Sequence, residues 1–182
     1  MPRLVMMSGL PGSGKSTLSK LLAERTGAKL LRIDVFEQDL RNQHGADFEV
    51  GTRGYRQGYT LAMQALREGR NVIADAVNAV DAARQGWRDV AAATDAEIVE
   101  IEILCSDTEE VRARLQTRDT GIEGLAPVPL SAVSTRPWEP NPNRQGVIDT
   151  SDKSITSCVD ALEQLAFGPR LTGGASRGNA RL

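Results

Sequence analysis

The sequence predicts an α/β domain built on a parallel sheet, and three observations support this fold class. Short apolar runs alternate with segments of helical periodicity along most of the 182 residues. A glycine-rich turn follows the first apolar run, and a proline-rich segment at 121–145 breaks the rhythm. Strands that alternate with helices favour a parallel sheet that is covered by helices on both faces.

The predicted strands are short runs rich in apolar residues. A run of four to eight such residues between turn signals is typical of a strand buried in a parallel sheet. Five such runs follow one another along the chain, at 3–8, 29–33, 71–75, 97–105 and 146–149. We therefore expect a five-stranded sheet.

Helices are predicted between these strands and after the last one. In the first helix, Leu18, Leu21 and Leu22 fall on one face, as expected for an amphipathic helix. Ser106 and Glu109 fit an S-x-x-E capping box, which predicts a helix start. The predicted helices cover about 14–24, a segment that begins after Asp34, 55–69, 82–94, about 106–117 and 154–167.

The chain length suits a single domain, which we place at 1–167. The five prolines of 121–145 indicate a lid and a loop beside a bound base, together at about 118–145, because long loops in compact domains are often functional. The tail at 168–182 is rich in Gly, Arg and Ser and is predicted to be disordered.

Composition excludes several classes of function. The net charge of −2 and the pI of about 5.5 argue against a nucleic-acid partner, which normally needs a basic surface. No signal core or membrane span is evident, so we expect a cytoplasmic protein. His44 is the single histidine, which argues against a histidine zinc site or a Ser-His-Asp triad. The sequence leaves the oligomeric state open.

The glycine-rich turn "GLPGSGKST" fits the pattern G-x-x-x-x-G-K-[ST], with a predicted strand before it and a helix after it. Such a loop points successive N–H groups at phosphate oxygens. Lys15 is expected to reach the β- and γ-phosphates during catalysis, and Ser16 to ligate Mg²⁺. The predicted nucleotide-binding residues are Gly9, Pro11, Gly12, Ser13, Gly14, Lys15, Ser16 and Thr17.

The rest of the chain indicates which nucleotide is bound and what happens to it. No N-K-x-D motif for guanine occurs, so ATP is expected. Asp75 ends the predicted third strand as a second magnesium ligand, and Ala76 rather than a carboxylate follows it. A carboxylate there would activate water, so its absence favours transfer of the phosphoryl group to another acceptor.

Candidate acceptor-binding residues follow the second and third predicted strands. Asp34 is expected to orient the acceptor hydroxyl or take its proton, and Arg41 lies two helical turns along the same face. Asp75 and Asn78 repeat this geometry on the third strand. Helix capping is the structural alternative, with Asp34 in a D-x-x-E box and Asn78 as an N-cap residue.

Two arginines one helical turn apart precede the proline-rich segment. Arg114 and Arg118 are expected to fold over ATP, where one packs on the adenine and one neutralises the transferring charge. The alternative is an exposed helix face, of which Arg112 is an example.

These residues resemble the P-loop kinases related to phage polynucleotide kinase and, more distantly, gluconate kinase and adenylylsulfate kinase. The resemblance rests on the glycine-rich loop, Asp34, the "DAVN" turn, the arginines and "VIDTS". It implies a three-layer P-loop fold with the strand order 2-3-1-4-5, with Asp34 activating the hydroxyl and Arg118 assisting transfer. Val35, Phe36 and Glu37 stand where polynucleotide kinases often have an arginine.

The sequence thus predicts an ATP- and Mg²⁺-dependent kinase acting on a hydroxyl of a small polar metabolite or natural product. Two alternatives stay open, a polynucleotide 5′-hydroxyl kinase and a non-catalytic nucleotide-binding module.

Overall fold

The computed structural model describes residues 1–117 and 120–169. Arg118, one of the predicted catalytic residues, therefore lies outside the described residues, as does the predicted tail beyond its first two residues. Within the described part of the chain, no helix is both long and apolar enough to cross a membrane.

The predicted parallel sheet and its strand order are confirmed. The described strands pair in the order β2-β3-β1-β4-β5, and every pairing is parallel. Met7 of the central strand lies opposite Asp75 on one side, and Asp75 lies opposite Arg32 on the next strand out. The strands are β1 (Arg3–Ser8), β2 (Lys29–Arg32), β3 (Val72–Asp75), β4 (Glu97–Leu104) and β5 (Gly146–Asp149).

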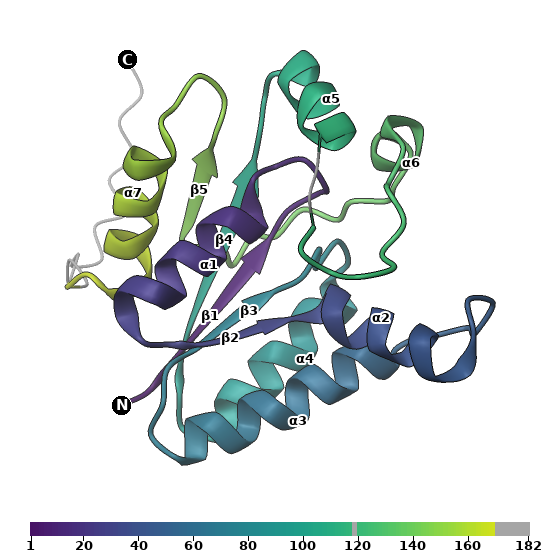
Figure 1. Ribbon diagram of the computed structural model, residues 1–182. Helices are drawn as coiled ribbons and strands as arrows, with labels where there is room; N and C mark the ends of the chain where they lie inside the picture. Colours follow the sequence, from purple (N-terminus) through teal and green to yellow (C-terminus); the bar gives the residue numbers. More distant parts are fainter. Residues whose placement is uncertain (118–119, 170–182) are drawn as a thin grey trace.

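Helices cover both faces of the sheet and give three layers (Figure 1). On one face α1 and α7 bury a cluster that includes Leu22 and Leu162. On the other face α3 and α4 bury a second cluster around Leu66 and Trp87. The described helices are α1 (Lys15–Thr26), α2 (Ile33–His44), α3 (Arg53–Arg67), α4 (Asp81–Ala92), α5 (Thr108–Thr117), α6 (Leu130–Ser134) and α7 (Ile155–Phe167).

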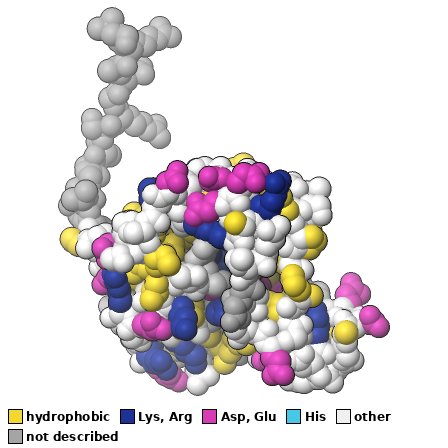
Figure 2. All heavy atoms as spheres, turned by 45° about the horizontal axis from the view of Figure 1, so that its top comes forward, with side chains coloured by type: hydrophobic (Ala, Val, Ile, Leu, Met, Phe, Trp, Pro, Cys, Tyr) yellow, Lys and Arg dark blue, Asp and Glu magenta, His cyan; other side chains and the backbone are white. Residues whose placement is uncertain are grey.

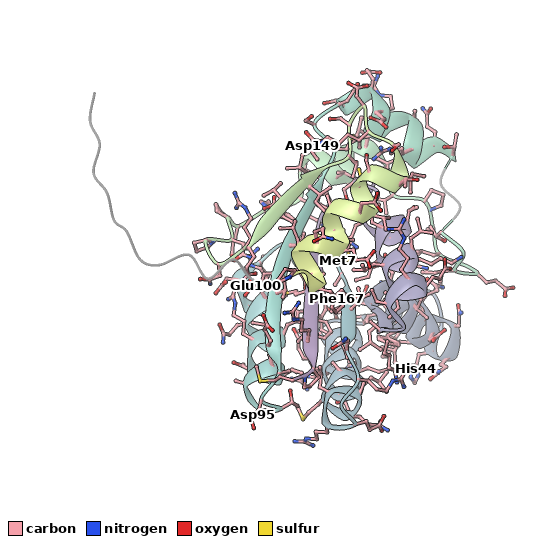
Figure 3. All side chains as sticks on the ribbon, turned by 90° about the vertical axis from the view of Figure 1, so that its left-hand side faces the viewer. Met7, His44, Asp95, Glu100, Asp149 and Phe167 are labelled. Carbon is pink, nitrogen blue, oxygen red and sulfur yellow. The ribbon has the colours of Figure 1, made fainter. Side chains whose placement is uncertain are left out.

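The two ends of the sheet differ in what they carry. Figure 3 shows Asp149 at the end where β5 finishes, and Asp95, in the turn before β4, at the opposite end. The carboxyl ends of parallel strands meet at one edge, and ligands bind in open α/β sheets at that edge. The glycine-rich loop after β1 and the first turn of α2 both lie there.

Two predicted helix starts were wrong. The second strand ends at Arg32 and α2 begins at Ile33, so Asp34 occupies the first helical turn and is not the N-cap residue. The start of α5 is capped by Asp107, whose carboxylate accepts from the N–H groups of Glu109 and Glu110. Ser106 instead bonds the hydroxyl of Ser151 on the neighbouring loop, a contact that local sequence does not reveal.

Glycines allow α2, α3 and α4 to pack closely. A side-chain carbon at Gly86 of α4 would lie 2.3 Å from the ring of Tyr59, and one at Gly58 of α3 would lie 2.4 Å from Ile33. Side-chain carbons essentially never approach other heavy atoms this closely. Gly86 therefore lowers helix propensity but admits the Tyr59 ring between the two helices.

Buried polar side chains anchor the end of the proline-rich segment. Arg84 of α4 is fully buried and donates to the carbonyls of Asn78, Glu139 and Pro140 at 3.0, 3.0 and 3.3 Å. The carboxylate of Glu100 on β4 accepts from Asn141 at 2.7 Å. Buried charged groups need such partners, so this segment is fixed to the domain at two points.

We predict that Arg84→Leu lowers the free energy of unfolding by about 3 kcal/mol, because one buried and two partly buried carbonyl groups lose their donor. Chemical denaturation measures this change. Arg112→Leu is the control, since Arg112 is exposed and should shift stability by no more than about 0.5 kcal/mol. Equal effects of the two variants would contradict the anchoring role of Arg84.

Candidate active site

The glycine-rich loop turns sharply between β1 and α1. Gly12 and Gly14 have positive φ values of 87° and 86°, a region that side chains with a Cβ rarely adopt. Gly14 immediately precedes the first residue of α1. The turn therefore brings backbone N–H groups and the positive end of the helix dipole to the same place, which is a site for anions.

A cleft of about 690 Å³ opens above this loop. Every residue from Gly9 to Thr17 lines it, which includes all the predicted phosphate-binding residues. The hydroxyl oxygen of Ser13 is buried without a hydrogen-bond partner, as expected for a group that awaits a ligand. These features fit a nucleoside triphosphate.

The amine of Lys15, which lines this cleft, forms an ion pair with the carboxylate of Asp75, which is buried and does not itself line the cleft. Ser19 donates to the other carboxylate oxygen at 3.2 Å, and the Nε of Arg32 lies 3.4 Å from it. Burial alone would raise the pKa of Asp75, but Lys15, Ser16 and Arg32 together lower it. Asp75 is therefore an anion held among cations and hydroxyl groups.

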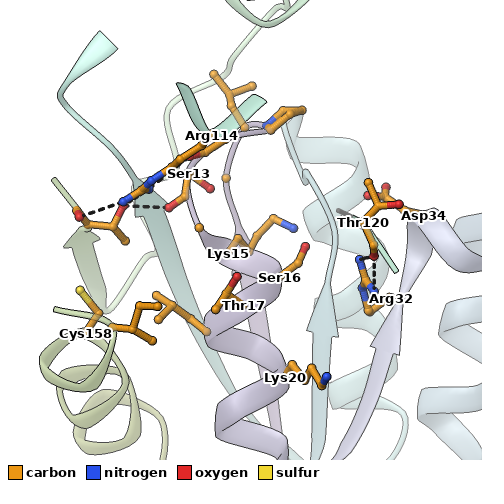
Figure 4. A pocket seen from close by; sticks show the side chains of 18 of the residues that line it. Ser13, Lys15, Ser16, Thr17, Lys20, Arg32, Asp34, Arg114, Thr120 and Cys158 are labelled. Carbon is orange, nitrogen blue, oxygen red and sulfur yellow. Dashed lines mark hydrogen bonds between the residues drawn. The ribbon is translucent and has the colours of Figure 1, made fainter. Parts of the chain in front are cut away.

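Arg32 is a cleft residue that the sequence interpretation missed. Its guanidinium lies in the cleft, where both terminal nitrogens donate to the carbonyl of Thr120 at 3.2 Å. Figure 4 shows Lys15 pointing from the loop toward the side of the cleft where Arg32 and Asp34 lie. The missed signal was its place at the end of a strand, two residues before Asp34, where its side chain faces the ligand edge of the sheet.

Arg114 holds the loop from the opposite side, as Figure 4 also shows. Its guanidinium donates to the carbonyl of Gly12 at 3.2 Å and to the hydroxyl of Thr150 at 2.7 Å, and it pairs with Glu110 at 2.6 Å. It also lines the cleft, and its contact with ATP stays a prediction. Thr150, which follows β5, bonds the carbonyl of Ser13 as well, so the last strand helps to fix the loop.

A second cavity of about 530 Å³ lies between α2, α3 and the segment after β3. Asp34 and Val77 line both this cavity and the nucleotide cleft. Burial, followed by the charge of Asp34, raises the pKa of Glu37. Burial raises the pKa of Tyr55 to about 12, so this phenol stays uncharged at neutral pH.

The remaining predicted acceptor residues lie elsewhere. Asn78 is fully buried: its amide donates to the carbonyl of Met7 at 2.9 Å and accepts from the indole of Trp87 at 3.1 Å. The N-cap alternative for Asn78 is wrong, because Val80 occupies the N-cap position of α4. Arg41 lines neither cavity and lies 3.8 Å from the carboxylate of Glu37.

The donor set suits a magnesium ion shared with phosphate oxygens. Among the described residues, no group of three or more His, Cys, Asp or Glu side chains could hold a metal. Mg²⁺ is commonly held by one or two protein oxygens together with phosphates and water. Of the two predicted ligands, Ser16 lines the cleft and Asp75 lies behind Lys15.

Comparison with known proteins places the chain among kinases. A family model described as an AAA domain matches residues 4–134. The adenylyl-sulfate kinase of Synechococcus sp. (strain JA-2-3B'a(2-13)) is 29% identical over 172 residues, which cover 88% of this chain and 91% of that protein.

Solved structures share the fold. The APS kinase CysC of Mycobacterium tuberculosis, in complex with AMPPNP and APS, matches with a TM-score of 0.65 and 19% identity, over 90% of this chain and 96% of that one. A gluconokinase from Sinorhizobium meliloti 1021 matches with a TM-score of 0.62 and 17% identity, over 91% and 94%. At these identities the likeness shows the fold.

We predict that Asn78→Ala lowers the free energy of unfolding by about 2–4 kcal/mol, because the buried carbonyl of Met7 and indole N–H of Trp87 both lose their partner. Urea denaturation measures the loss, and the exposed Asn143→Ala serves as control. Unchanged stability together with reduced turnover would instead support the predicted contact between Asn78 and the substrate.

Proposed function

The chain belongs to the AAA domain family and is similar to adenylyl-sulfate kinases, and from this premise we propose that it is an ATP- and Mg²⁺-dependent kinase. It transfers the γ-phosphoryl group to a hydroxyl of a small polar metabolite or natural product. ATP supplies the phosphoryl group and Mg²⁺ neutralises charge on it when both are bound.

One observation carries this proposal: Asp34 lines both the nucleotide cleft and the second cavity. A phosphoryl donor in the first and a hydroxyl compound in the second would meet beside this carboxylate. Pockets of a few hundred cubic ångströms are the usual size for small-molecule sites. A pure nucleotide switch has no need of the second cavity.

Three residues near the point where the cleft and the second cavity meet have different roles in the transfer of the phosphoryl group. Asp34 orients the acceptor hydroxyl and accepts its proton as the new O–P bond forms and the bond from the γ-phosphorus to the bridging oxygen breaks, which releases ADP. Lys15 leaves Asp75 to stabilise the β- and γ-phosphate oxygens. Arg32 places a second positive charge on the acceptor side of the cleft, where it can stabilise charge on the transferring group.

Transfer to an alcohol, rather than hydrolysis, is supported at the end of β3. The residue beside Asp75 is Ala76, which is buried and offers no base for water. On the face seen in Figure 2, Lys and Arg side chains are interspersed with Asp and Glu, whereas a strand of nucleic acid needs a basic groove.

A screen of hydroxylated metabolites and 5′-hydroxyl oligonucleotides with ATP and Mg²⁺ tests the function, with mass spectrometry to detect phosphorylated products. A small-molecule product supports the proposal, and an oligonucleotide product would favour the polynucleotide alternative. Nucleotide binding without transfer to any compound would favour the non-catalytic module.

We predict that Asp34→Asn lowers turnover by about 10²–10⁴-fold, the usual contribution of a positioned general base, while ATP affinity is retained. Because Asp34 lies in the first turn of α2 without serving as its N-cap, the stability change should stay within about 1 kcal/mol. Steady-state kinetics and nucleotide titration separate these effects.

Two further variants control this experiment. Asp39→Asn removes an exposed carboxylate of the same helix that lines neither cavity and should leave turnover unchanged. Lys15→Ala should reduce ATP binding or transfer. Near-normal turnover of Asp34→Asn would refute its role as the base.

A further inference from the structure

We propose that the second cavity selects an alcohol with an apolar or aromatic body and a positively charged amine. This inference rests on the proposed kinase function and names the class of its acceptor. It depends on three features of the cavity: fixed aromatic walls, an apolar side, and carboxylates that lie deeper than the arginines.

The aromatic walls are held in place before any ligand binds. The hydroxyl of Tyr55 accepts from the backbone N–H of Asn78 at 3.3 Å, and that of Tyr59 donates to the carbonyl of Ala83 at 2.8 Å. The Tyr59 ring also packs edge-on against Trp87, with ring centroids 4.6 Å apart. A preformed wall binds a ligand without an ordering penalty.

One side of the cavity is apolar. Ile33, Val77 and Val80 line it, together with small alanine side chains that leave room near the start of α4. A sugar or polyol would leave these surfaces without a favourable contact, because apolar surface gains free energy only when it is covered by apolar groups. The acceptor must therefore present a hydrophobic part as well as its hydroxyl.

The charged residues are arranged by depth. Asp34 and Glu37 lie one turn apart on the same face of α2 and both line the cavity, and the Glu37 side chain is 25% exposed. Arg56 and Arg136 also line it but are exposed. Among the side chains that line this cavity, the two carboxylates are therefore more buried than the two arginines, which lie at its rim.

The stem of Glu37 is fixed by α3. A side-chain carbon at Gly54 would lie 2.5 Å from the Cγ of Glu37, so the absence of a side chain there admits Glu37 against the helix. The guanidinium of Arg41 pairs with Glu37 at 3.8 Å, which is beyond hydrogen-bond distance. A ligand ammonium beside Glu37 would form the closer contact.

Ammonium recognition follows from these features together. Glu37 supplies a charge-assisted hydrogen bond, which is about twice as strong as a neutral one, and the neighbouring Tyr55 ring attracts cations through its face. A carboxylate or phosphate on the acceptor would instead meet Asp34 and Glu37 in a partly desolvated space. The cavity therefore disfavours acceptors that carry a negative charge near the reacting hydroxyl.

Matched acceptors test this selectivity. One set is phenylalaninol, 3-phenylpropanol and phenyllactate; a second is phenyl glucosaminide, phenyl glucoside and phenyl glucuronide. Each set keeps the aromatic body and a hydroxyl while its charge runs from positive through neutral to negative. Binding is measured by calorimetry with the non-hydrolysable analogue AMPPNP and Mg²⁺ present, and phosphorylation is measured with ATP.

The variant Glu37→Gln tests whether the Glu37 carboxylate binds the ammonium group of the acceptor. It should lower binding and kcat/KM for the ammonium compounds by about 10- to 100-fold, the range expected for a hydrogen bond to a charged group, and leave the neutral compounds little changed. Glu68→Gln is the matched control, because Glu68 is exposed at the C-cap position of α3. Arg136→Gln should keep or increase the preference for ammonium.

Each outcome bears on either the inference or the function. Preferred binding of anionic compounds, no charge preference, no binding by any compound, or an unaltered preference in Glu37→Gln would overturn the inference. Preferred binding of ammonium compounds without phosphorylation of any hydroxyl would contradict the kinase function and leave the selectivity of the cavity in place.

Discussion

The rest of the site depends on the contacts that the buried carboxylate of Asp75 makes with its cationic and hydroxyl partners. Asp75 lies at the carboxyl end of β3, between the strands that carry the phosphate loop and Arg32. Lys15 and Ser19 of α1 and Arg32 of β2 all direct polar atoms at it. A buried carboxylate without such partners is strongly destabilising, so this one fixes α1 and β2 relative to each other.

The same carboxylate couples folding to the state of the nucleotide cleft. Because its pKa is lowered in the folded protein, its contribution to stability is present above the unfolded pKa and is lost as pH falls through the folded value. The Lys15 amine pairs with this carboxylate, and under the proposed function it would also bind phosphate oxygens in the cleft. Arg32 gives Asp75 a second cation, so the carboxylate would keep a partner if Lys15 moved to a phosphate.

The sequence predicted the sheet, its order and the phosphate loop, because these depend on patterns that are local or shared with a known family. The role of Arg32 was missed because it depends on Asp75 and Thr120, which are far away in the sequence. The buried position of Asn78 was missed for the same reason, since its partners are Met7 and Trp87. Polar residues near strand ends look alike in a sequence whether they face a ligand or the core.

The same contrast between local and long-range contacts distinguishes the nucleotide half of the site from the proposed acceptor half. The phosphate-binding part of the nucleotide cleft is one continuous loop and the start of the helix after it, so its geometry depends on glycine conformations and on the helix N-terminus. The proposed acceptor half is assembled from side chains of α2, α3, the segment after β3 and the chain after α6. Substitutions there change shape and charge without disturbing Asp75 or the loop. Under the proposed function, the fold can therefore keep one phosphoryl donor while its acceptor differs, and the acceptor must be identified from the cavity rather than from the motif.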